Sequence, residues 1–72
     1  MSKETDAIRQ GLAQYHAAEY DRDGHDFWRD VEKDVLEASV KDHVRRNSPE
    51  DTSHEEVHVL TMLTLKELAK RR

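Results

Sequence analysis

Five consecutive residues of this sequence have types and spacing that could support metal chemistry. They are His54-Glu55-Glu56-Val57-His58, which match the pattern H-E-x-x-H. Histidines four positions apart on an α-helix lie on one face and can share a Zn²⁺ ion. The glutamate between them could act as a general base toward a metal-bound water. The pattern predicts a metal site, provided that other parts of the fold supply further ligands.

The segment also resembles short signatures of two metalloprotein families. HEEVH resembles the zincin metalloprotease signature, which implies His54 and His58 as zinc ligands and Glu55 as base. Glu55 and His58 resemble the Glu-x-x-His pair of ferritin-like di-iron bundles. That resemblance implies a site shared by two copies of the chain, with Glu19 as a bridging carboxylate. Outside this segment His16, His25 and His43 have no partner at ligand spacing.

Composition restricts the other classes of function. The 72 residues include 12 basic and 16 acidic ones, no cysteine, and a formal net charge of −4. Nucleic-acid-binding domains usually carry a basic stripe, and a recognition helix beginning Ser53-His54-Glu55-Glu56 would present acid to phosphates, so nucleic acid is not expected as a partner. No stretch approaches the length of a membrane span, and the first ten residues lack the apolar core of a signal peptide. We therefore expect a cytoplasmic protein that has no contact with membranes.

Hydrophobic periodicity predicts an all-α fold, a small three-helix bundle within a single domain, 1–72. The helices are expected over about 3–22, 26–46 and 53–71. Ile8, Leu12 and Tyr15 follow helical spacing and are expected to face the core. Asp26 is the expected cap of the second helix, and Ser53 with Glu56 fits a capping box at the start of the third.

Residues 57–65 read VHVLTMLTL and carry no formal charge, which makes this segment the expected centre of the bundle. Their alternation of Val, Thr and Leu also fits a β-strand. We favour a helix because helix signals flank both ends and no second strand is available for pairing. A helix that is apolar nearly all round must be covered on most sides. A second copy of the chain would complete that cover, so a homodimer is expected.

The second helix carries two apolar seams, which predicts two neighbours. Phe27, Val31, Val35 and Ala38 form one seam, with Trp28 at its edge, and Leu36, Val40 and Val44 form the other. Because the usual catalytic parts are missing, we expect a non-catalytic, protein-binding regulator or adaptor of bacterial or phage type. Its binding patch is expected at Trp28, Leu36, Val40 and Val44. The alternative is a protein that binds Zn or Fe through His54, Glu55, His58 and Glu19; otherwise no cofactor is expected.

Overall fold

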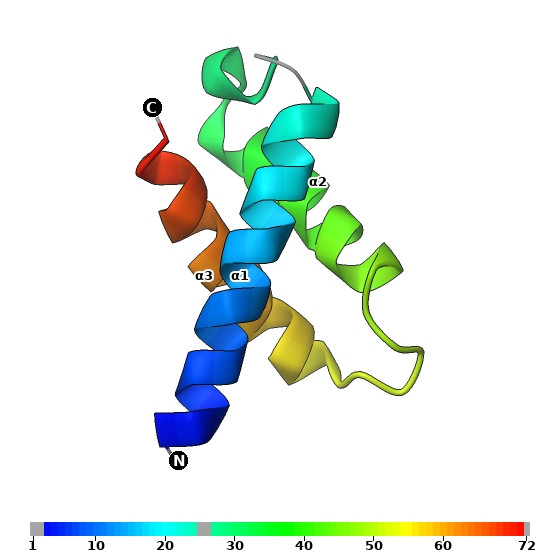
Figure 1. Cartoon of the computed structure of the whole chain (residues 1–72). Coiled ribbons are helices and arrows are strands. Elements are labelled where there is room, and N and C mark those ends of the chain that lie inside the picture. The colour runs from blue at the N-terminus through cyan, green and yellow to red at the C-terminus, as the bar shows by residue number, and fades with distance from the viewer. Residues whose placement is uncertain (1–2, 25–26, 72) are drawn as a thin grey trace.

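The computed structural model describes residues 3–24 and 27–71, and these residues form an all-helical bundle without a strand. Helix α1 spans Lys3–Gly24, a 3-10 helix η1 spans Phe27–Asp30, α2 spans Lys33–Arg46 and α3 spans His54–Ala69. Helix α3 packs against both α1 and α2, as the crossing of α1 over α3 in Figure 1 illustrates. The expected three-helix bundle with a central C-terminal helix is therefore confirmed.

Residues 57–65 are helical, so the strand interpretation of this segment is wrong. The helix begins as its capping signal predicts, because the Ser53 hydroxyl accepts a hydrogen bond from the Glu56 amide at 3.1 Å. The second half of the capping box differs from the expectation. The Glu56 carboxylate accepts two hydrogen bonds from the Arg9 guanidinium, at 2.9 and 2.7 Å, and so ties α3 to α1.

The second predicted helix is shorter than expected and begins at Lys33 instead of about residue 26. Its expected cap, Asp26, lies outside the described residues. The chain is extended at Glu32, with φ −60° and ψ 149°, and this separates η1 from α2. On one continuous helix Trp28 would point about 80–160° away from the Leu36–Val44 seam, at 100° per residue. The break allows Trp28 to enter the same core as that seam.

The core gathers residues from all four elements. Its members are Ala17, Tyr20, Trp28, Leu36, Val40, Val44, Val57, Leu60 and Leu68, with Val31 and Leu65 packed against them. On α3 the buried Thr61 and Thr64 donate their hydroxyls to the carbonyls of Val57 and Leu60, so these polar groups are satisfied inside the core.

Helix α1 packs through a different face from the one expected. Ala13, His16, Ala17 and Tyr20 are buried, whereas Ile8, Leu12 and Tyr15 are exposed. Two of these buried residues are alanines, whose small side chains allow the backbone of α1 to approach its neighbours closely. The assignment of Ile8, Leu12 and Tyr15 to the core is therefore wrong.

Within the described chain, no helix combines the length and the apolarity needed to cross a lipid bilayer.

Candidate functional site

The residues expected to bind a partner protein are interior residues of this fold. Trp28, Val40 and Val44 are fully buried, and Leu36 is nearly so. Trp28 is held further by its indole N–H, which donates to the Asp21 carboxylate at 2.5 Å. An exposed binding patch at these four residues is therefore ruled out as long as the chain is folded. The other seam of this region behaves oppositely, since Phe27, Val35 and Ala38 are exposed.

The HEEVH segment forms the first turns of α3. His54, Glu55 and His58 are exposed, and Glu56 is half-buried in its pairing with Arg9. Among residues 3–24 and 27–71, no third potential ligand converges on His54 and His58. Glu19, the predicted bridging carboxylate, lies elsewhere, with its Oε1 atom 3.4 Å from Nε2 of His43. The structure thus separates Glu19 from the other three predicted ligands.

Glu19 belongs instead to a cluster that the sequence spacing did not identify. His16 and Glu19 lie one turn apart on α1, and His43 reaches them from α2. One potential ligand atom from each residue lies within 4.8 Å of the other two. His16 and Glu19 form an i, i+3 pair that could have been noticed in the sequence. The contribution of His43, 27 positions further along, depends on how α1 and α2 meet.

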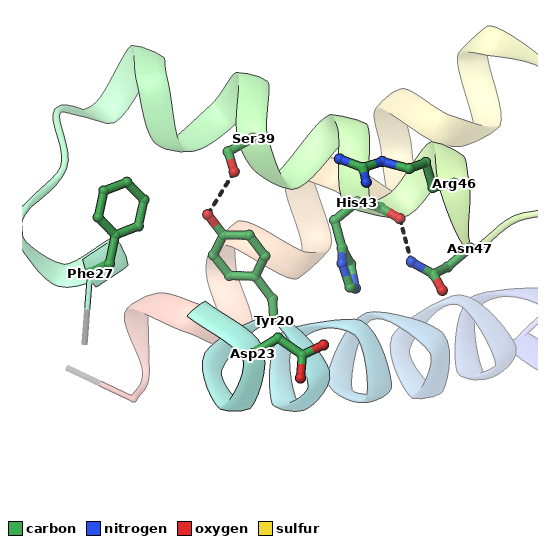
Figure 2. A pocket seen from close by; sticks show the side chains of 7 residues that line it. All are labelled: Tyr20, Asp23, Phe27, Ser39, His43, Arg46 and Asn47. Carbon is green, nitrogen blue, oxygen red and sulfur yellow. Dashed lines mark hydrogen bonds between the residues drawn. The ribbon is translucent and has the colours of Figure 1, made fainter. Parts of the chain in front are cut away.

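An open pocket lies beside this cluster, between the C-terminal half of α1 and α2. Figure 2 shows His43 pointing from α2 toward α1, and Tyr20 pointing from α1 toward α2. The Tyr20 hydroxyl and the Ser39 hydroxyl are hydrogen-bonded at 2.8 Å. The His43 ring makes edge contacts with the rings of His16 and Tyr20, both with centroids 5.7 Å apart. These contacts fix the His43 ring against α1.

Burial shapes the protonation of this cluster. Loss of hydration lowers the pKa of His16 below its usual value, and the neighbouring His43 lowers it further, against the opposing effect of Glu19. His16 is therefore held as a neutral imidazole near pH 7. On the outer side of α1, a hydrogen bond to the Glu19 carboxylate raises the pKa of the Tyr15 hydroxyl.

A second feature is an uncovered apolar row on α1. Ile8, Leu12 and Tyr15 are 64%, 42% and 55% exposed, and the helical period places them on one side of the helix. We call these three residues the outer face of α1. Gly11 lies beside this face, and a Cβ atom added there would meet no atom within 4 Å. The helix thus presents a smooth apolar surface next to a small residue.

Comparison with protein-family models, with curated proteins and with solved structures found no match to this chain. The outer face of α1 and the cluster of His16, Glu19 and His43 are the two features of the structure that point to a function.

Proposed function

We propose that this protein is a non-catalytic interaction protein, a small regulator or adaptor, which assembles through the outer face of α1. The observation that carries the proposal is the row of Ile8, Leu12 and Tyr15, three large apolar side chains left in water by a chain of only 72 residues. Single exposed apolar residues are ordinary, whereas contiguous ones on one helix face are typical of interaction surfaces. The proposed occupant is a second copy of this chain.

An antiparallel pairing of two α1 helices fits the residues on this face. A two-fold axis between Gly11 and Leu12 would place Ile8 of each copy opposite Tyr15 of the other. The small Gly11 would lie at the crossing, where close approach of two helices needs room. Antiparallel helix dipoles also attract each other.

The size of the face predicts the strength of the association. Complete burial of a large apolar side chain contributes about 1.5–3 kcal/mol, and roughly half of each of these side chains is exposed. The outer faces of two copies would thus contribute about 5–9 kcal/mol, against an association cost of about 4–15 kcal/mol. The difference favours association by at most about 5 kcal/mol, so we expect a weak, reversible dimer with a dissociation constant no tighter than about 0.2 mM.

The test is sedimentation equilibrium over a concentration range of about 20 µM to 2 mM. We expect the mean mass of the wild-type protein to rise toward that of a dimer, and the Leu12→Glu variant to stay monomeric throughout. Leu12 is exposed, so the circular dichroism of the variant should match that of the wild type.

The matched control is Gln14→Glu, which adds the same charge to an exposed position about 160° around α1 from Leu12. This variant should dimerise like the wild type. A wild-type protein that remains monomeric at 2 mM, or a Leu12→Glu variant that dimerises as well as Gln14→Glu, would refute assembly through this face.

A further inference from the structure

The buried cluster between α1 and α2 has no role in the proposed dimer. It consists of two imidazoles and one carboxylate, from His16, His43 and Glu19. We propose that these three residues bind a divalent transition-metal ion, with Zn²⁺ as the ion that their donor atoms fit best. The HEEVH segment takes no part in this site, and of the outer face of α1 only Tyr15 touches it, through its hydrogen bond to Glu19 and its ring contact with His16.

The donor atoms already lie near the arrangement that zinc requires. Tetrahedral bonds of about 2.0–2.2 Å separate neighbouring ligand atoms by roughly 3.3–3.5 Å. The Nε2 atom of His43 and the Oε1 atom of Glu19 are 3.4 Å apart, which matches this spacing. All three donor atoms lie within 4.8 Å of one another. Side-chain rotations that move these atoms by about an ångström would therefore bring all three to tetrahedral spacing.

The imidazole nitrogens supply an independent reason to expect a ligand. His16 is only 5% exposed, yet its Nδ1 atom has no hydrogen-bond partner among residues 3–24 and 27–71. Within the same part of the chain the buried Nε2 atom of His43 also lacks a hydrogen bond, and its 3.4 Å approach to Glu19 is longer than a usual hydrogen bond. Buried polar atoms are nearly always satisfied, and a bound ion or water is one explanation for those that are not. A metal ion at this position would accept the lone pairs of the imidazoles.

The surrounding side chains hold the ligands in place. Tyr20 and Ser39 each lie one helical turn from a ligand, Tyr20 from His16 and Ser39 from His43, and their hydroxyls join α1 to α2 at 2.8 Å. The rings of His16 and Tyr20 flank the His43 ring edge to face. These contacts restrict the rotation of His43, which lowers the entropy lost when an ion binds.

The choice of metal follows from the donors and from their protonation. Imidazole nitrogen with a single carboxylate suits Zn²⁺ and its transition-metal neighbours, whereas Mg²⁺ and Ca²⁺ prefer oxygen ligands throughout. A histidine must be neutral to bind a metal, and burial lowers the pKa of His16, which favours the neutral form. Three protein ligands are the number found in zinc sites that keep a fourth position for water.

The ion would act as a cross-link between two helices. Helices α1 and α2 each pack mainly on α3 and meet each other over a smaller area. A metal bound by His16 and Glu19 of α1 and by His43 of α2 would link the two helices directly. The expected consequence is a folded state that becomes more stable as the concentration of free Zn²⁺ rises.

The experiment titrates Zn²⁺ into the metal-free full-length protein near pH 7, with calorimetry for affinity and thermal unfolding for stability. We expect one ion per chain at the cluster. At a free concentration 100 times the dissociation constant, the unfolding midpoint should rise by about 10–20 °C. Co²⁺ provides a second readout, because its visible absorption is intense in a four-coordinate site and weak in water.

Three variants identify the ligands. His43→Gln and His16→Gln should each weaken binding by at least about 100-fold, since loss of an outer-shell partner alone costs about 10–100-fold. His16 is buried, so Glu19→Gln, at a half-buried position, serves as the variant that keeps the fold; it should also weaken binding. Circular dichroism of each metal-free variant verifies that the helices are intact.

The matched control is the double variant His54→Ala/His58→Ala, which removes the exposed histidine pair of HEEVH and leaves the cluster unchanged. Wild-type affinity in this control, with loss in the three cluster variants, supports the site. Loss of binding in the control alone would assign the ion to HEEVH and overturn the proposal. No binding to a folded wild-type chain, or equal binding in all variants, would also overturn it. Because Leu12→Glu leaves all three ligands in place, failure of the metal site and failure of the assembly are distinguishable.

Discussion

Trp28 and Phe27 are neighbours in the sequence with opposite environments in the structure. Trp28 is fully buried, whereas Phe27 is 62% exposed. The two residues therefore form a matched pair for testing how η1 and the break before α2 position the core. We predict that Trp28→Ala strongly destabilises the fold and that Phe27→Ala does not.

The magnitude follows from what each side chain loses. Replacing a buried Trp by Ala costs about 3–5 kcal/mol in lost burial and cavity formation. The lost hydrogen bond to Asp21 adds little, because that carboxylate is partly exposed and remains near Arg29 and Arg71, each at 3.8 Å. A chain of 72 residues is expected to have a total stability of about 4–11 kcal/mol. Trp28→Ala should thus be marginally folded or unfolded at 25 °C.

The assay is urea unfolding followed by far-UV circular dichroism, since Trp28 is the sole tryptophan and its fluorescence is lost in the variant. Phe27→Ala should lose less than about 1 kcal/mol, as expected for a largely exposed side chain. The result would contradict this placement if Trp28→Ala lowered the free energy of unfolding by less than about 1 kcal/mol, or if Phe27→Ala lowered it more than Trp28→Ala does. Trp28 would then not be the buried ring of the pair. The break at Glu32 would then not bring Trp28 into the core.

Two further variants test local features of the helices. Gly11→Ala should raise the free energy of unfolding by about 0.5–1 kcal/mol in the same urea assay, because the added Cβ meets no atom and restricts the unfolded chain; a destabilised variant would contradict the open surroundings of Gly11. The hydrogen bonds from Arg9 lower the pKa of the Glu56 carboxyl from its usual value of 4.5, so this pair stabilises the fold above about pH 4.5 and is lost as the pH falls through the lower folded-state pKa. Glu56→Gln should flatten that part of the stability–pH curve more than Glu55→Gln does, and equal curves would refute the role of the pair.

The third helix was predictable because its signals are local. A capping serine, a charge-free apolar run and a basic end are all read within one segment, and each acts on the backbone nearby. The alternation of Val, Thr and Leu in residues 57–65 also fitted a strand. That interpretation failed because a strand needs a partner, and the described residues supply only helices.

The packing face of α1 was not predictable from hydrophobicity, because most of its buried residues are alanines or histidine and only Tyr20 is a large hydrophobic side chain. Ala13 and Ala17 contribute little apolar area individually, and His16 counts as polar in any scale. Their advantage is steric, since they let α1 lie close to its neighbours. The larger Ile8 and Leu12 dominate a hydrophobicity pattern but would hold the helices further apart.

The HEEVH segment and the cluster of His16, Glu19 and His43 differ in how their potential ligands come together. HEEVH is conspicuous because its ligands are close in sequence, but the start of α3 is exposed and brings no third ligand to them among the described residues. His16 and His43 lack a sequence relation and meet only because α1 turns its packing face inward. A ligand set assembled by tertiary packing has buried, preoriented donor atoms, whereas a local pair on a helix surface remains in competition with water. On this argument His16, Glu19 and His43 should bind Zn²⁺ more tightly than the HEEVH pair does, and the titration of their variants measures that difference directly.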